Sequence, residues 1–335
     1  MTEKKFFWPT VITVAAIAIA STGFFLWKYL DENRIADAGQ VENVASTEAC
    51  KGDFIDTHLH FDDIDFFENL IPQMKQHRIG CAIAFINMGN NGEDPREKLE
   101  LVDENPGLVI PFFHVDPRSE NDLAPTKLQE VINRYPGYFR GFGEIAFYRP
   151  PFQQSNLRDQ IWSDLMDFLL QNDLWLQFHL RNNSQLPEFE ELIAKHPDNK
   201  FLLHGPELYA ELPMLLQKYN NLYFTLDTAS LIEKPGFGAD RVLMYPHNMK
   251  KDGFTSYFDE NYQAILDSAV SKWKPVFDSA PDRVMWGTDG SISWHADKDI
   301  YNQLIRFSND FITSLNPEYR EPFTHQNASR LFLSR

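Results

Sequence analysis

Short apolar segments alternate with longer amphipathic ones from residue 53 to the end of the chain. The apolar segments read as continuous runs of Val, Ile, Leu and Phe, which is typical of parallel strands buried on both faces. We predict eight strands: Phe54–His60, Cys81–Asn87, Leu108–Val115, Phe139–Ala146, Leu174–Leu180, Lys200–His204, Leu222–Leu226 and Val284–Thr288.

Most of these strands are followed by a stretch with helical periodicity and helix-boundary residues. Pro187 suits the first turn of one such helix, and Ser155 is placed to cap another that runs through Gln171. Eight strand–helix units predict an α/β fold of the (β/α)8 TIM-like barrel type over residues 53–335, with an open doubly wound sheet as the alternative.

The N-terminus has a different pattern. Lys4 and Lys5 precede an apolar run from Phe6 to Trp27. About 20 apolar residues cross a bilayer as a helix, and positive charge ahead of the run favours a cytoplasmic N-terminus. We therefore predict a transmembrane anchor over residues 1–30, a polar tether over residues 31–52, and an exported domain after it.

A cleaved signal peptide is the alternative, because Ala18-Ile19-Ala20 resembles a cleavage site. The apolar run continues through Phe24-Phe25-Leu26-Trp27, which is unusual after such a site, so an uncleaved anchor is favoured. The expected location is a bacterial inner membrane with the domain on the periplasmic side, or the periplasm if the segment is cleaved.

Charge and cysteine content narrow the partners and the compartment. The chain carries 31 basic and 48 acidic residues, a net charge of −17, which argues against a nucleic-acid partner. Its two cysteines, Cys50 and Cys81, are a disulfide candidate in an exported protein. Two buried free thiols remain an equal alternative.

A His-x-His pair lies at the end of the first predicted strand, in Asp56-Thr57-His58-Leu59-His60. Alternate residues of a strand project to the same side, so His58 and His60 lie next to each other. Two imidazoles in this arrangement provide half of a metal site.

Later strands also end in residues that bind metals. They are Glu144, His179, His204 and Asp289, near the ends of the fourth, fifth, sixth and eighth strands. In a barrel, the chemistry is located at the carboxyl ends of the strands. The spacing from His60 to Glu144 suits three strand–helix units. Together these residues predict one centre.

This set resembles the amidohydrolase superfamily over the whole domain from Asp53 to Arg335. The matching motifs are Asp-Thr-His-Leu-His, Gly-Glu-Ile around Glu144, and Trp-Gly-Thr-Asp-Gly around Asp289. The C-terminal segment Gln326–Phe332 is similar to that of the amidohydrolase-related branch, also called amidohydrolase 2. TatD-like metal-dependent hydrolases are the near relative.

The resemblance implies a divalent metal, zinc as the first candidate, with one or two ions bound. It implies six ligands: His58, His60, Glu144, His179, His204 and Asp289. With two ions, Glu144 would bridge them. Asp289 would be the general base for a metal-activated water, and His204 would orient that water in single-metal members.

The expected function is a metal-dependent hydrolase that cleaves an ester, lactone or amide bond of a small molecule. A decarboxylase or lyase on the same scaffold is the first alternative, then a TatD-like nuclease, then a non-catalytic binding module. Arg149 and Arg181 are candidates for binding a substrate carboxylate. The insertion Leu231–Phe258 is a candidate lid, and the oligomeric state is open.

Overall fold

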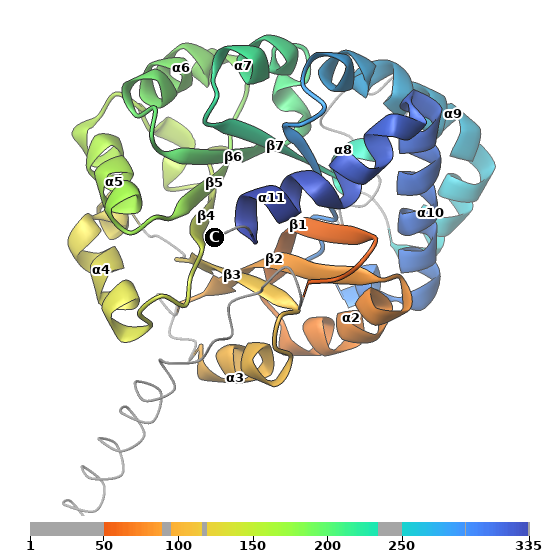
Figure 1. The fold of residues 1–335 in the computed structure, drawn as a ribbon, viewed down its shortest axis with the longest axis horizontal. Helices are drawn as coiled ribbons and strands as arrows, with labels where there is room; N and C mark the ends of the chain where they lie inside the picture. The colour runs from red at the N-terminus through yellow and green to blue at the C-terminus, as the bar shows by residue number, and fades with distance from the viewer. Residues whose placement is uncertain (1–49, 89–94, 116–118, 234–249, 292, 334–335) are drawn as a thin grey trace, which may run out of the picture.

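The structure is a computed structural model that describes residues 50–88, 95–115, 119–233, 250–291 and 293–333. Eight parallel strands follow one another in sequence order around a nearly closed barrel (Figure 1). They are β1 (Phe54–Phe61), β2 (Ile79–Asn87), β3 (Val109–His114), β4 (Gly141–Ala146), β5 (Trp175–His179), β6 (Lys200–His204), β7 (Leu222–Asp227) and β8 (Val284–Gly287).

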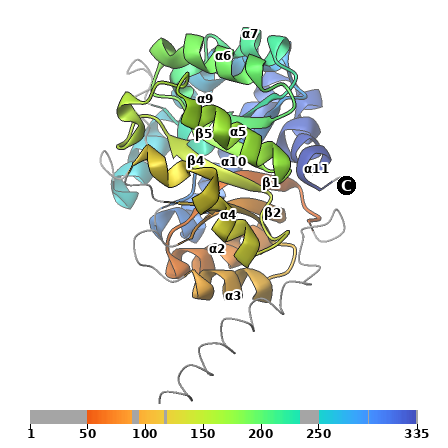
Figure 2. The same ribbon diagram turned by 90° about the vertical axis from the view of Figure 1, so that its left-hand side faces the viewer.

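Helices surround the strands and bury their outer faces (Figures 1 and 2). They are α2 (Ile64–Gln76), α3 (Arg96–Glu104), α4 (Pro125–Arg134), α5 (Gln160–Gln171), α6 (Leu186–Lys195), α7 (Leu212–Lys218), α8 (Thr228–Leu231), α9 (Lys251–Ser279), α10 (Lys298–Leu315) and α11 (Asn327–Phe332). The (β/α)8 barrel predicted from the sequence is therefore confirmed.

The first strand meets the chain that leaves the last one, and this contact excludes an open sheet. The backbone N–H of His60 donates to the carbonyl of Gly290 at 2.9 Å, and that of Asp289 donates to the carbonyl of His58 at 2.9 Å. These two bonds join the carboxyl end of β1 to the residues after β8. The seam of the barrel therefore lies beside the predicted metal ligands.

Two hydrophobic clusters stabilise the barrel. The larger fills the space between strands and helices, as the apolar strand sequences predict. The smaller contains residues from six strands, including Ile55, Phe112 and Met285, and so lies inside the barrel. It extends to Phe332 of α11, whose ring lies 4.6 Å from that of Trp175 at the start of β5.

The helix α11 covers the amino-terminal end of the barrel (Figure 1). The side-chain amide of Asn327 donates to the carbonyls of Pro281 and Val284, at 2.8 and 2.9 Å, where β8 begins. At the same end a disulfide joins Cys50 to Cys81, with their Cα atoms 5.1 Å apart. The structure therefore decides for the disulfide and against two free thiols.

Two of the predicted boundaries are wrong. Ser155 does not cap α5, because that helix begins at Gln160, after Asp159. The hydroxyl of Ser155 instead donates to the carboxylate of Glu120. The intervening residues form a turn that the sequence pattern does not reveal. The predicted insertion Leu231–Phe258 is also too long, because residues from Lys251 onward belong to α9.

The predicted N-terminal segments lie almost entirely outside the described residues, so the anchor over 1–30 stays a prediction. Of the tether over 31–52, the structure describes only the last three residues. Among the helices of the described residues, none combines the length and the apolar character needed to cross a bilayer.

Candidate metal centre

Six predicted side chains meet at the carboxyl ends of five strands. His58 and His60 come from β1, Glu144 from β4, His179 from β5 and His204 from β6, and Asp289 follows β8. Five of them are almost completely buried, and only His60 is partly exposed. Two overlapping groups place their nitrogen and oxygen atoms within 4.8 Å of one another: His58, His60 and Asp289, and His58, Glu144 and His204.

The first group lies at the barrel seam. The Nε2 atoms of His58 and His60 are 3.2 Å apart, and the Oδ1 atom of Asp289 lies 3.6 and 3.4 Å from them. Asp289 has a left-handed backbone (φ 54°), which Asp tolerates better than most residues and which is common where function fixes a side chain.

The second group is arranged around Glu144. Its Oε1 atom lies 2.6 Å from Nε2 of His204 and 3.5 Å from Nδ1 of His179, while Oε2 lies 3.4 Å from Nε2 of His60. The two oxygens of Glu144 therefore face opposite halves of the cluster. A carboxylate placed in this way has the geometry needed to bridge two sites.

The charges in this cluster depend strongly on one another. Burial by itself would raise the pKa of Glu144, but the imidazoles of His204 and His179 hold that pKa well below its usual range. Burial opposes the charged form of His60, but Asp289 and Glu144 outweigh it and raise the pKa of His60 to about 9. Burial lowers the pKa of His58, which lies deepest. The carboxylates and imidazoles of this cluster thus shift one another's pKa values.

The donor set fits a divalent metal of the zinc type. Neutral imidazoles and carboxylates are the ligands that such ions take. The Nδ1 atoms of His58 and His179 are buried and have no hydrogen-bond partner within the described residues. Nδ1 of His179 faces Glu144. A cation between them would be bound by this buried nitrogen, which otherwise has no partner within the described residues.

Sequence reasoning missed four residues that contact the ligands. Asp227, the last residue of β7, lies behind His204 with their Oδ2 and Nδ1 atoms 3.3 Å apart. The carboxylate of Glu207 accepts from Nε2–H of His179 at 2.7 Å, and the ring of Tyr148 packs edge-on against the same imidazole, with centroids 4.6 Å apart. Asp227 and Glu207 share the signal that revealed the ligands, because both lie at or just after a strand end.

The fourth missed residue, Asp56, ties β1 to β8 beneath the ligands. Its Oδ1 atom accepts from the backbone N–H groups of His58 and Thr288, each at 3.0 Å, and Oδ2 accepts from the Thr288 hydroxyl at 2.6 Å. Asp56 is only 1% exposed, and burial raises the pKa of its carboxyl group to about 7. Its bonds fix the strand from which both histidines project.

The two candidate substrate-binding arginines lie at the rim. Arg149 is exposed, with its guanidinium carbon 5.2 Å from the ring centre of Tyr148, which in turn contacts His179. Arg181 donates through Nη1 to the backbone carbonyl of Gln153, so it also braces the loop after β4. The part of the candidate lid at residues 234–249 lies outside the described residues.

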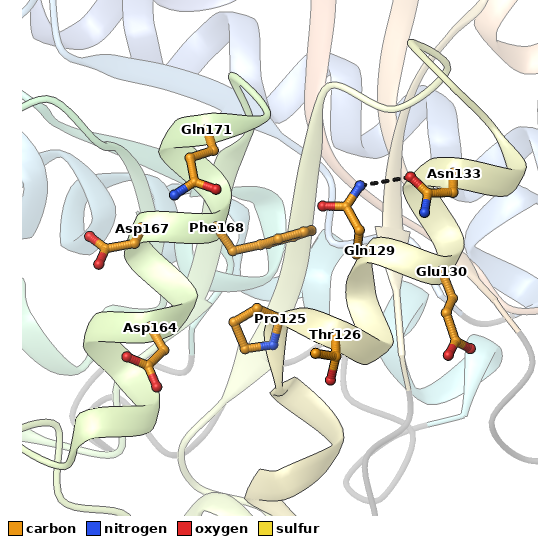
Figure 3. A pocket seen from close by; sticks show the side chains of 9 residues that line it. All are labelled: Pro125, Thr126, Gln129, Glu130, Asn133, Asp164, Asp167, Phe168 and Gln171. Carbon is orange, nitrogen blue, oxygen red and sulfur yellow. Dashed lines mark hydrogen bonds between the residues drawn. The ribbon is translucent and has the colours of Figure 1, made fainter.

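A separate groove of about 550 Å³ lies on the outside of the barrel, between α4 and α5 (Figure 3). Phe168 forms its floor, and a hydrogen bond between Gln129 and Asn133 runs along one wall. None of the predicted site residues lines it.

Comparison with known proteins decides the family. A family model described as Amidohydrolase matches residues 55–333, which include all six predicted ligands. The chain belongs to the amidohydrolase family. The resemblance read from the motifs, including the amidohydrolase 2 branch, is thereby confirmed. Amidohydrolases are metal-dependent, and the clustered His, Glu and Asp side chains suit that chemistry. Comparison with curated protein sequences found no significant match.

Solved structures show the same fold at low sequence identity. A TatD homologue from Escherichia coli matches with a TM-score of 0.54 and 14% identity, over 86% of this amidohydrolase and 100% of that chain. A D-hydantoinase from a Bacillus species matches with a TM-score of 0.50 and 13% identity, over 84% and 71% of the two chains. A protein from Agrobacterium tumefaciens matches with a TM-score of 0.53 and 15% identity, over 87% and 99%.

Proposed function

We propose that this amidohydrolase hydrolyses an ester, lactone or amide bond of a small molecule, with a divalent metal, zinc as first candidate, at the cluster described above. The observation that carries the proposal is the placement of Glu144 between two groups of imidazoles, with one oxygen facing each. This arrangement suits two ions better than one. A bound metal would lower the pKa of its water to about 7 and so supply hydroxide at neutral pH.

The predicted residues have different proposed roles. His58, His60 and Asp289 would hold one ion and His179 and His204 the other. Asp289 is also the proposed general base, because a carboxylate beside the proposed ion could take the proton of the attacking water. With a single ion bound, His204 would instead orient the water.

Substrate recognition is proposed for Arg149 and Arg181. Both lie on loops that follow strands β4 and β5, where barrel enzymes bind their substrates. A guanidinium binds a carboxylate through two hydrogen bonds. Replacing Arg149 or Arg181 by Met should raise KM for an anionic substrate by about tenfold, as expected for one charge-assisted contact. An unchanged KM removes that arginine from the site.

The decisive experiment combines metal content with product analysis on the full-length protein. We expect two equivalents of zinc or manganese per chain, and hydrolysis of members of a panel of esters, lactones and amides that disappears when the metal is chelated. No bound metal under any loading condition would sink the proposal. Release of CO2 from carboxylated substrates, without hydrolysis, would favour the decarboxylase, and cleavage of DNA would favour the TatD-like nuclease.

We propose that the enzyme works outside the cytoplasm, held by the segment 1–30. The disulfide between Cys50 and Cys81 supports an oxidising compartment, because such bonds are rare in the cytosol. Membrane fractionation, with protease added to intact and to permeabilised cells, tests the location. A protein found with the cytosolic fraction and carrying two free thiols would contradict it.

A further inference from the structure

Asp227 lies directly behind the metal centre and takes no part in the ligand groups. It is the last residue of β7 and is 1% exposed. Burying a carboxylate this deeply costs several kcal/mol unless its oxygens find partners. Both oxygens of Asp227 are therefore expected to have polar partners.

The two oxygens have different partners. Oδ1 accepts from the backbone N–H of Ser230 at 2.6 Å and so caps the short helix α8. Oδ2 faces two imidazoles: it lies 3.3 Å from Nδ1 of His204 and 3.8 Å from Nδ1 of His58. Only the contact with His204 is within hydrogen-bond distance. The rings of the two histidines meet edge to face, with centroids 4.0 Å apart, so the imidazole of His204 in turn packs against His58.

The opposite sides of both imidazoles face the centre. Nε2 of His204 lies 2.6 Å from Glu144, and Nε2 of His58 lies 3.2 Å from Nε2 of His60. An imidazole whose Nδ1–H points at a carboxylate keeps its lone pair on Nε2. Asp227 thus favours the tautomer in which His204 presents a lone pair on Nε2 to a metal.

We propose that Asp227 is a positioning residue that orients His204 and holds its imidazole in the form that binds metal through Nε2. The inference rests on the proposed function, because it gives Asp227 a role only if the centre holds metal. Partners of this kind, lying behind the ligands, typically contribute 10- to 100-fold to metal affinity.

A purely structural role, capping α8, is the competing explanation, and Asp227→Asn separates the two. Asn and Asp cap helices about equally well. With its oxygen on the Ser230 N–H, however, the Asn side chain turns an NH2 group toward Nδ1 of His204, where an acceptor is needed. The matched control is Asp63→Asn, because Asp63 caps α2 by accepting from the Asp65 N–H at 3.0 Å and is exposed.

The test measures zinc affinity of the full-length protein by competition with a chromophoric chelator. We expect Asp227→Asn to weaken zinc binding by about 10- to 100-fold and Asp63→Asn to leave it unchanged. Thermal unfolding of the metal-free proteins should be similar for all three. If Asp227→Asn fails to fold, Asp227→Ser is measured instead, since Ser also caps but is too short to reach the imidazoles.

A second readout needs no activity. In zinc-loaded protein labelled with ¹⁵N-histidine, we expect the signal of His204, protonated at Nδ1, to shift in Asp227→Asn and not in Asp63→Asn. A folded Asp227→Asn that binds zinc as tightly as wild type would overturn the inference. Signals showing His204 protonated at Nε2 would also overturn it. Either result would leave the proposed function standing. A wild-type protein that takes up no metal would overturn both.

Discussion

The two ends of the barrel are built from the same strands but carry opposite chemistry. At the amino-terminal end, Trp175 of β5 and Met285 of β8 pack in an apolar cluster that α11 and the disulfide close. At the carboxyl end, the same two strands lead to His179 and Asp289. The polarity therefore changes along these two strands within four residues.

This difference shows how one domain combines stability with a polar site. Apolar packing and a covalent link hold the strands at one end, where nothing has to bind. At the other end, carboxylates and imidazoles lie close together at some cost in stability, which is expected of sites kept for function. Substitutions at the carboxyl end should then affect activity more than stability. Substitutions at the amino-terminal end should affect stability more than activity.

The largest effect should come from Asp289→Asn at the carboxyl end. Loss of the general base should lower kcat by about 10²–10⁴-fold. The remaining oxygen of Asn still faces the histidines, so bound metal should be retained. Steady-state kinetics on a substrate found in the hydrolytic screen, with metal content measured on the same sample, checks this. The control is Asp62→Asn, an exposed neighbour of His60. Activity within tenfold of wild type would remove Asp289 from the base role.

At the opposite end, removing the disulfide should affect stability alone. The bond closes a loop with a sequence separation of 31, so the double variant Cys50→Ala/Cys81→Ala should lose about 3–4 kcal/mol of unfolding free energy. Chemical denaturation of the metal-free protein measures this. Zinc affinity should be unchanged, because both cysteines lie at the amino-terminal end of the barrel, opposite the predicted ligands. A variant that binds zinc more weakly would show that the two ends are coupled.

A smaller loss is expected from Phe332→Ala on α11. The side chain is 6% exposed and packs on Trp175 and Phe112, so the cavity left behind should cost about 3 kcal/mol. Denaturant unfolding compares it with Leu170→Ala, a side chain on α5 that is 46% exposed and should cost under about 0.5 kcal/mol. Equal losses in the two variants would mean that α11 does not seal the barrel.

The smallest effect concerns pH. His196 follows α6, and burial lowers the pKa of its imidazole below the ordinary value of about 6.5. As pH falls through about 6.5, the unfolded chain takes up the proton before the folded protein does. The stability contributed by the neutral imidazole is therefore lost as pH falls toward the lower pKa of the folded protein. Wild type should therefore lose more Tm than His196→Gln between pH 7.5 and 5.5. If Tm fell equally with pH in wild type and in His196→Gln, the lowered pKa of His196 would be contradicted.

The sequence allowed much of the centre to be predicted, because its residues share one simple property. Each ligand lies at or near the end of an apolar strand, and a barrel brings strand ends together. Asp227 was missed because the predicted strand stopped at Leu226, one residue too early, so the acidic residue at its end was not considered. Glu207 was missed because it follows the strand end by three residues, in a turn whose path the pattern does not give.

Asp56 and Tyr148 show a different limit. Both are near ligands in the sequence, but their roles come from partners far along the chain: Thr288 is 232 residues from Asp56, and His179 belongs to the next strand after Tyr148. Hydrophobic periodicity reports which way a side chain points and whether it is buried. It contains no information on which residue lies opposite.

The sequence by itself determined the order of strands and helices, the family, and which residues project into the barrel mouth. Local physics suffices for these, because apolar runs and the alternation of side chains along a strand are properties of short segments. The tertiary structure alone decided that Glu144 divides its oxygens between two groups, that Asp227 lies behind His204, and that Asp56 joins β1 to β8. These contacts depend on the register and closure of the barrel, which bring residues within hydrogen-bond distance only after all eight strands have paired.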